Sequence, residues 1–277
     1  MKAAAGLIVS FAFLCLLQAG CGDGDVEADG YALAVTNSYL GCAVRDLWGG
    51  DVPVLCLAPA GMCPGHFDIS PTQVRQLKNC TLLLRFDFQQ GIEDRLTRLR
   101  EKGLDVQLIQ PTGGLCVPDT YAEVCRQVCG ALSRVYPEKA GEYEARLTAV
   151  ESRLAALAAQ LRGSVAGSRA AGAAVLSSNH QVEFARWLGL EPIATFVGSD
   201  TETVANIDHC LKKAAGREVR FVIANRQEGT ALAQALGDRC GAKAVVFSNF
   251  PEACDQDAGF DRLLQDNVRL LCEAVAK

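Results

Sequence analysis

The stretch AGMCPGHFDISPTQ, residues 60 to 73, places a cysteine and a histidine three positions apart, Cys63 and His66. Thiolate and imidazole are donors that zinc prefers, and four such donors complete a tetrahedral site. The glycines and prolines around the pair favour a fixed loop rather than a helix face. The pair therefore indicates either part of a metal site or a structural turn, and the position of the loop in the fold decides between them.

Two further metal-capable side chains, Cys116 and His180, follow apolar runs that are typical of buried strands. In open parallel sheets a ligand binds beyond the carboxyl ends of the strands, so residues that follow strands are candidate site residues. By the same rule we expect possible cleft contacts from Arg85, Asp119, Asn225, Gln227 and Ser248. Two readings stay open for each metal candidate: Cys116 is a ligand or a buried thiol, and His180 is a ligand or a polar contact near a helix start.

The sequence contains no sign of enzymatic chemistry. It has neither a G-x-x-x-x-G-K-[ST] phosphate-binding loop nor a G-x-S-x-G nucleophile elbow. His209 and Cys210 are neighbours in a predicted helix, where adjacent side chains point about 100° apart. Cys125 and Cys129 lie one helical turn apart and could chelate, but packing of small buried residues explains them more simply. We therefore expect a binding protein and not an enzyme.

From residue 31 onward, short apolar runs alternate with amphipathic stretches, which is the pattern of parallel βαβ units. Strands are predicted at 31–36, 52–58, 81–86 and 105–109, and again at 172–178, 192–197, 218–224 and 243–248. The predicted fold is α/β, with two doubly wound parallel-sheet lobes joined by one long α-helix.

The joining helix is predicted from apolar residues spaced three and four apart between residues 138 and 162. Pro137 opens this run and Gly163 closes it, and a helix of that length spans roughly 35 to 40 Å. A two-stranded coiled coil is the alternative interpretation of the same pattern. The predicted domains are an N-terminal lobe at 31–137, the linking helix at 138–163 and a C-terminal lobe at 164–277.

Residues 1 to 21 are typical of a lipoprotein signal, with Lys2 before the apolar run LIVSFAFLCLL and a cysteine in LQAGC. We expect a lipid on Cys21 and a tether at residues 22 to 30, which anchor the protein to the outside of the bacterial cell membrane. A plain secretory signal, which would leave the protein periplasmic, is the alternative.

Charge and cysteine content limit the partners and the disulfides. A net charge of −5 without any Lys/Arg-dense run gives nucleic acids and anionic membranes little to bind. Of the thirteen cysteines, removal of Cys15 with the signal and of Cys21 to lipid leaves eleven. Since eleven is odd, the remaining thiols cannot all pair with one another.

Several segments resemble the metal-binding receptors of zinc and manganese ABC importers. AVTNSYLGCAVRDLWGGDVPVLCLAPAG resembles the first strand, helix and second strand of that family, and YPEKAGEYEARLTAVESRL resembles the start of its long helix. FARWLGLEPIATF and CGAKAVVF resemble segments of its second lobe. The resemblance covers nearly all of the mature chain, and it implies a monomer that holds metal in a cleft between two lobes and delivers it to an ABC permease.

The ligand positions of that family are altered in this sequence. The first histidine of the family falls on Gly65, one residue early, and the second falls nearest Cys116 or Asp119. The third falls on Ser178, two residues before His180. The acidic ligand expected after the seventh or eighth strand is missing from the turns ANRQ and SNF. The resemblance therefore implies a divergent receptor with a changed ligand set.

The sequence thus predicts an extracytoplasmic substrate-binding component of an ABC transporter that captures a divalent transition metal. The cargo is zinc or another soft or borderline transition metal, and its predicted ligands are Cys63, His66, Cys116 and His180. One alternative keeps the fold and binds an organic solute or metal chelate through Arg85, Asp87, Gln89, Asn225, Arg226 and Gln227. The other is a thiol or redox protein with a disulfide between Cys63 and Cys116, although no C-x-x-C motif occurs.

Overall fold

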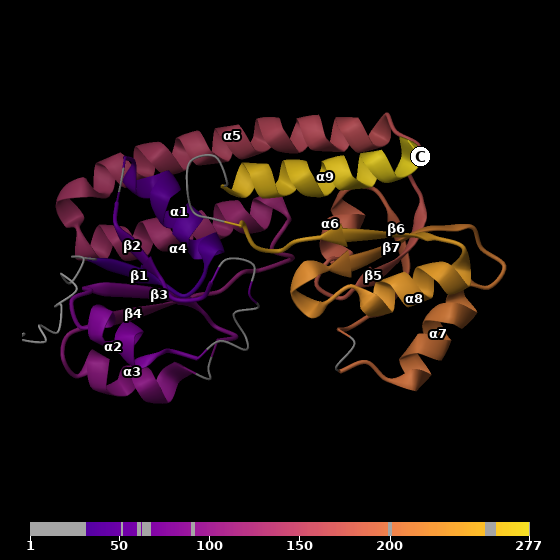
Figure 1. Ribbon diagram of the computed structural model, residues 1–277. Coiled ribbons are helices and arrows are strands. Elements are labelled where there is room, and N and C mark those ends of the chain that lie inside the picture. Colours follow the sequence, from indigo (N-terminus) through magenta and orange to yellow (C-terminus); the bar gives the residue numbers. More distant parts are fainter. Residues whose placement is uncertain are drawn as a thin grey trace, which may run out of the picture.

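The structure is a computed structural model that describes residues 32–50, 52–59, 62, 68–89, 92–198, 201–252 and 259–276. Two α/β lobes lie side by side, and one long helix runs along both of them (Figure 1). The predicted signal, Cys21 and the tether lie outside the described residues, and so do Cys63 and His66.

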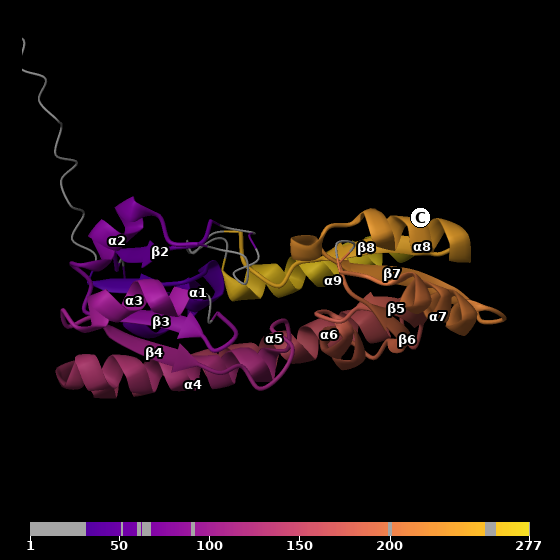
Figure 2. The same cartoon turned by 90° about the horizontal axis from the view of Figure 1, so that it is seen from below.

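The N-terminal lobe is built on four parallel strands in the order β2-β1-β3-β4. Its strands are β1 (Leu33–Val35), β2 (Val54–Cys56), β3 (Leu82–Phe86) and β4 (Asp105–Ile109). Its helices are α1 (Ser38–Trp48), α2 (Pro71–Leu77), α3 (Glu93–Arg100) and α4 (Pro118–Val135). Helices α1 and α4 cover one face of the sheet and α2 and α3 the other, as two views at right angles show (Figures 1 and 2). Covered on both faces, β3 is buried along its whole length.

The C-terminal lobe repeats this scheme with the order β6-β5-β7-β8. Its strands are β5 (Ala174–Ser178), β6 (Glu191–Phe196), β7 (Val219–Asn225) and β8 (Lys243–Phe247). Its helices are α6 (Val182–Trp187), α7 (Val204–Ala214), α8 (Ala231–Cys240) and α9 (Phe260–Ala276). Helices α6 and α9 pack on the face of the sheet that belongs to the same core as the long helix between the lobes, and α7 and α8 pack on the opposite face. The prediction of two parallel α/β lobes is confirmed.

The linking helix α5 (Ala140–Ala166) follows a short 3-10 turn, η3 (Pro137–Lys139). The prediction that Gly163 ends it was wrong by three residues. Leu157, Leu161 and Val165 are all buried at three- and four-residue spacing, so the apolar face continues past the glycine. This face packs on α1, α4 and α9 of the same chain, which explains the periodicity without a coiled coil.

The two lobes share one hydrophobic core. A single cluster of buried side chains extends from β1 and β3 through α1, α4 and α5 to β7, β8 and α9. The first residue of α9, Phe260, stacks on Tyr121 of α4 with ring centroids 3.8 Å apart and planes 5° apart. It also meets Tyr39 of α1 edge-on at 5.5 Å. Helix α9 is therefore a second connection between the lobes, which the sequence did not predict.

Charged groups tie the same helices together. Arg153 of α5 binds both carboxylate oxygens of Asp46 on α1, at 2.7 and 3.0 Å, and Asp261 of α9 at 3.1 Å. The Tyr121 hydroxyl donates to Asp46 at 2.8 Å. Four helices from both lobes thus meet at one ionic cluster. Across the residues that the structure describes, no helix combines the length and apolar character needed to cross a membrane.

Candidate functional site

A cavity of about 520 Å³ lies between the lobes, at the carboxyl ends of the strands. The N-terminal lobe contributes residues that follow β3 and β4, namely Phe88, Pro111, Gly113, Gly114 and Leu115. The C-terminal lobe contributes residues that follow β5, β7 and β8. The direction of the chain crossovers reverses between β1 and β3 and between β5 and β7, and such switch points are where parallel sheets form ligand clefts.

An imidazole and a carboxylate form a pair in the C-terminal wall of this cavity. His180 Nδ1 lies 2.8 Å from Glu228 Oε1. The imidazole is 61% exposed, whereas the Glu228 side chain is only 15% exposed. The other oxygen of Glu228 accepts the Ser178 hydroxyl at 2.5 Å, and the Ser178 oxygen accepts the backbone N–H of His180 at 3.2 Å. Glu228 therefore binds both Ser178, the last residue of β5, and His180, which follows the strand.

The pair shifts both pKa values toward the charged forms. The hydrogen bond with Glu228 raises the pKa of His180 above its ordinary value, against a smaller lowering by burial. Burial would raise the pKa of Glu228, but hydrogen bonds from His180 and Ser178 lower it below its ordinary value. Glu228 is therefore ionised at neutral pH, and His180 donates its Nδ1–H to it. Within the described part of the chain, Nε2 of this ring has no hydrogen-bond partner.

Local backbone geometry brings Glu228 to this position. It is the last residue of a 3-10 turn, η4 (Arg226–Glu228), that directly follows β7. Gly229 ends the turn at a φ of +85°, a backbone conformation that residues other than glycine rarely adopt. Gly198, after β6, approaches so closely that a Cβ there would lie 3.1 Å from the Glu228 Cβ. These two glycines allow the turn to carry the carboxylate toward the end of β5.

Amide side chains form the floor of the cleft where α6 meets the ends of β7 and β8. Gln181 has no exposed surface, and its Nε2 donates to Asn249 Oδ1 at 2.9 Å and to Asn225 Oδ1 at 3.3 Å. Gln227 accepts the backbone N–H of Asn249 at 3.1 Å. Because amides are neutral, this floor supplies hydrogen-bond donors and acceptors but no charge.

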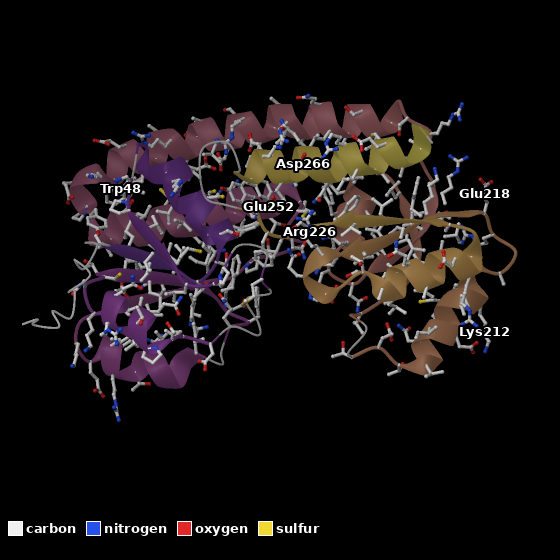
Figure 3. The ribbon with its side chains drawn as sticks, in the orientation of Figure 1. Trp48, Lys212, Glu218, Arg226, Glu252 and Asp266 are labelled. Atoms are coloured by element: carbon white, nitrogen blue, oxygen red, sulfur yellow. The ribbon has the colours of Figure 1, made fainter. Side chains whose placement is uncertain are left out.

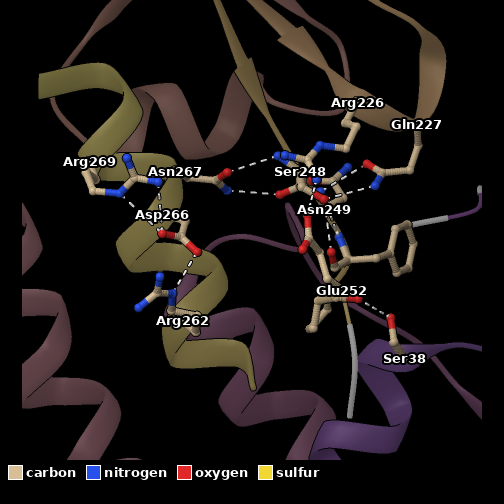
Figure 4. Close-up of polar contacts among 12 residues, drawn as sticks. Ser38, Arg226, Gln227, Ser248, Asn249, Glu252, Arg262, Asp266, Asn267 and Arg269 are labelled. Atoms are coloured by element: carbon tan, nitrogen blue, oxygen red, sulfur yellow. Dashed lines mark hydrogen bonds and ion pairs between the residues drawn. The ribbon is translucent and has the colours of Figure 1, made fainter. Parts of the chain in front are cut away.

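Helix α9 supports this floor from behind, as Figure 4 shows. Asn267 accepts the backbone N–H of Ser248 at 3.0 Å and donates to its carbonyl at 2.9 Å. The Ser248 hydroxyl in turn accepts a hydrogen bond from Gln227 Nε2 at 2.9 Å. The turn after β8 is therefore held by the helix that also joins the lobes.

Two contacts cross from lobe to lobe at the edge and the base of the cavity. Glu183 of α6 accepts the backbone N–H of Gly114, where a Cβ would lie 2.9 Å from the Glu183 Cβ. The Cys116 thiol donates to the Ser248 carbonyl at 3.0 Å. Burial raises the pKa of this thiol, against a lowering by the hydrogen bond from Asn267. Cys116 is thus a neutral thiol that joins the lobes beneath the cavity.

The family model described as "Zinc-uptake complex component A periplasmic" matches residues 116–274, which is more than half of the chain. The chain belongs to the zinc-uptake complex component A family. The resemblance predicted from the sequence is thereby confirmed. The description of this family is that of a periplasmic component of metal uptake, which agrees with the expectation of a solute-binding protein.

Solved structures support the same fold. A manganese-bound periplasmic metal-binding protein from Candidatus Liberibacter asiaticus matches with a TM-score of 0.75 and 14% identity, over 88% of this chain and 98% of that one. A cadmium-bound form of that protein gives a TM-score of 0.73 at 14% identity, with the same coverage. A crystal structure of ZnuA gives 0.71 at 16% identity, over 89% and 100% of the two chains. No curated protein matches the sequence significantly.

Of the four predicted metal ligands of this zinc-uptake family member, the described residues include two, His180 and Cys116. His180 lines the cavity, and Cys116 lies beneath it with 1% of its surface exposed. Cys63 and His66 fall outside the described part of the chain. Among the residues that are described, no group of three or more His, Cys, Asp or Glu side chains is arranged to hold a metal.

The predicted cleft contacts also differ in position. Asn225 and Gln227 line the cavity, and Ser248 lies behind it in the network with Asn267. Arg85 is buried in β3, and its Nη1 donates to the carbonyl of Phe86 at 3.0 Å, so it does not line the cavity. Asp119 is exposed in the first turn of α4 and does not line the cavity either.

Sequence reasoning missed Glu228, the carboxylate at the centre of this site. The expectation that no carboxylate follows the seventh strand was wrong, because ANRQ ends one residue before it. Strand β7 leads into η4, and the third residue of this 3-10 turn, Glu228, contacts the end of β5. Gly229, directly after it, is the signal that could have extended the search to the end of the turn.

Proposed function

We propose that this protein is the extracytoplasmic substrate-binding component of an ABC importer, and that it captures a divalent transition metal, preferentially zinc, in the cleft between its lobes. The His180–Glu228 pair carries this proposal. A carboxylate bound to one ring nitrogen fixes the tautomer, orients the ring and leaves the other nitrogen to ligate a metal. The exposed Nε2 of His180 meets that requirement at the cavity wall.

The remaining ligands of the proposed site stay predictions from the sequence. Cys63 and His66 would supply one thiolate and one imidazole. Cys116 requires the loss of its hydrogen bond to Ser248 and of its proton before it can ligate, and burial opposes ionisation. We therefore assign His180 the leading role and Glu228 the role of its orienting carboxylate.

The proposed mechanism is capture and delivery, without catalysis. Metal replaces the proton on His180 Nε2, so that capture weakens as the pH falls. The loaded protein, a monomer, then presents both lobes to a membrane permease. The lipid on Cys21, supported by the signal-like residues 1 to 21, keeps it at the outer side of the membrane; mass spectrometry of the mature N-terminus tests this assignment.

The test is zinc stoichiometry and affinity of the mature protein, purified under reducing conditions without chelator. We expect one bound zinc, lost or strongly weakened in His180→Ala and in a double Cys63→Ala/His66→Ala variant. Glu228→Gln keeps the shape of the side chain but removes its charge, and is expected to weaken zinc by about 10- to 100-fold.

Two matched controls separate the site from general effects. His209→Ala removes a histidine from the exposed side of α7, and Glu218→Gln removes a charge at the far end of the C-terminal lobe, where Figure 3 labels Glu218. Both should bind zinc like the unmodified protein. Zinc binding that survives unchanged in His180→Ala and Glu228→Gln would overturn the proposal.

A further inference from the structure

The cavity is larger than a metal ion with protein ligands requires. Zinc in a closed protein site has four donors at about 2.0 to 2.3 Å and leaves no space beyond them. A cavity of about 520 Å³ falls instead within the range of roughly 300 to 1,000 Å³ that is typical of pockets for small organic molecules.

The two carboxylates that line this cavity already accept hydrogen bonds from the protein. Glu228 accepts hydrogen bonds from His180 and Ser178, and Glu183 accepts the backbone N–H of Gly114. Among the described lining residues, His180 Nε2 and the second oxygen of Glu183 are free to bind a metal, but no group of three or more His, Cys, Asp or Glu side chains is arranged to hold one. A metal held here therefore needs further donors from another molecule or from residues outside the described part.

Phe88 gives the opposite wall an apolar surface. Its side chain is 49% exposed, and it stacks on Phe86 with ring centroids 5.1 Å apart and planes 27° apart. Met62, Leu108 and Val204 are the other large apolar side chains found exposed among the described residues, and none of them lines the cavity. Together with Leu115 and Phe250, Phe88 offers a surface for carbon rather than for a hydrated ion.

We infer that the cleft binds its metal as a complex with a small organic chelator of the amino-acid class, with His180 as protein donor and Phe88 packed on the chelator. This inference rests on the proposed function. An amino nitrogen and a carboxylate oxygen close a chelate ring on a borderline metal. Each amide side chain has two N–H donors and an oxygen with two lone pairs, so Asn225 and Gln227 can form further hydrogen bonds beside those they make within the protein. These match the remaining carboxylate oxygen and amino hydrogens of the chelator. The side chain of the chelator packs on the apolar wall.

The test is equilibrium dialysis of the mature protein with radiolabelled zinc and labelled L-histidine, supplied separately and together. Histidine lowers the free zinc concentration, so it must weaken the binding of a bare ion and strengthen the binding of a complex. We expect labelled histidine to be retained only when zinc is present, and zinc retention to rise when histidine is added.

Phe88→Ala is expected to weaken retention of the zinc–histidine complex by about 10-fold or more, as for a buried aromatic contact, and to change binding of zinc alone little. Phe88→Tyr keeps the ring and should restore binding. Leu108→Ala is the matched control, because Leu108 is 48% exposed but lies outside the cavity.

The outcomes separate this inference from the proposed function. Zinc bound at one equivalent but reduced by histidine, with no histidine retained, overturns the inference and leaves the metal receptor standing. Histidine retained without zinc also overturns it, since the cargo is then the organic solute itself. Neither label retained in any arm overturns the metal receptor and the inference together.

Discussion

Replacing Phe260 by alanine is expected to destabilise both lobes together. Phe260 begins α9, which belongs to the C-terminal lobe, yet its ring stacks on Tyr121 and meets Tyr39 in the N-terminal lobe. It is 2% exposed and part of the core cluster that runs through both lobes. A side chain with these contacts stabilises the joined molecule rather than one half of it.

The expected loss follows from burial and ring contact. Truncation of a buried phenylalanine to alanine costs about 3 to 5 kcal/mol, which includes the transfer of the ring and the cavity left behind. The stacked pair with Tyr121 accounts for about 0.5 to 1.5 kcal/mol of this. The same substitution at Phe88, which is 49% exposed, should cost about 1 kcal/mol or less and serves as the control.

The chain carries one tryptophan in each lobe to report the result. Trp48, labelled on the N-terminal lobe in Figure 3, contacts Tyr136 and Tyr143, while Trp187 stacks on Phe184 in the C-terminal lobe. Single-tryptophan proteins made with Trp187→Phe or Trp48→Phe therefore follow each lobe by fluorescence during urea unfolding. We expect the two curves to coincide, with and without Phe260→Ala, and to move to lower urea together.

Curves that separate would refute the shared core. A shift confined to the Trp187 curve would show that α9 stabilises its own lobe alone. Unchanged midpoints for both probes would show that the contact of Phe260 with Tyr121 contributes nothing to folding.

Three further predictions follow from named contacts. Because the pKa of His180 is raised and that of Glu228 is lowered, their pair stabilises the fold most between about pH 4.5 and 6.5. This gain is lost as the pH rises through the raised pKa of His180 or falls through the lowered pKa of Glu228. In urea unfolding across pH, the stability difference between the unmodified protein and His180→Ala should therefore be largest in that range and shrink on both sides of it, and a difference that does not change with pH would contradict this. The native Cys116 thiol should resist alkylation at pH 8 and react on unfolding, as peptide mass mapping will show, whereas rapid native labelling would contradict its burial. Gly163→Ala should stabilise by about 0.5 to 1 kcal/mol in thermal unfolding, while Gly237→Ala should destabilise, since its Cβ would lie 2.7 Å from a backbone oxygen; a stabilising effect at both positions would contradict this.

The sequence predicted the strands and helices well because each one carries a strong local signal. Strand β4 spans the predicted residues 105–109, and β5, β6 and β8 lie within the predicted ranges 172–178, 192–197 and 243–248 to within a residue. The role of α9 could not be predicted in the same way. Its amphipathic pattern indicates one buried face, but periodicity does not state which lobe covers the first turn. The first turn is covered by Tyr39 and Tyr121, which lie more than a hundred residues earlier in the chain.

The site was harder to predict, because it depends on side chains that meet across turns. Listing the residues after each strand placed His180, Asn225 and Gln227 at the cavity. The same rule could not separate Cys116 as a ligand from Cys116 as a buried thiol, since both follow a strand. Its hydrogen bond to the Ser248 carbonyl involves the other lobe, and no local pattern encodes that contact.

The altered ligand positions have a common physical consequence at Glu228. The resemblance to the family predicts a histidine at the position of Ser178, which is buried with 1% exposure and donates its hydroxyl to Glu228. His180, two residues further along, binds the same carboxylate and extends into the cavity. A metal on its Nε2 would therefore lie in the cavity. Phe88 lines the same cavity with an apolar surface. A cargo that contacts both His180 and Phe88 would therefore combine a metal ion with an organic group.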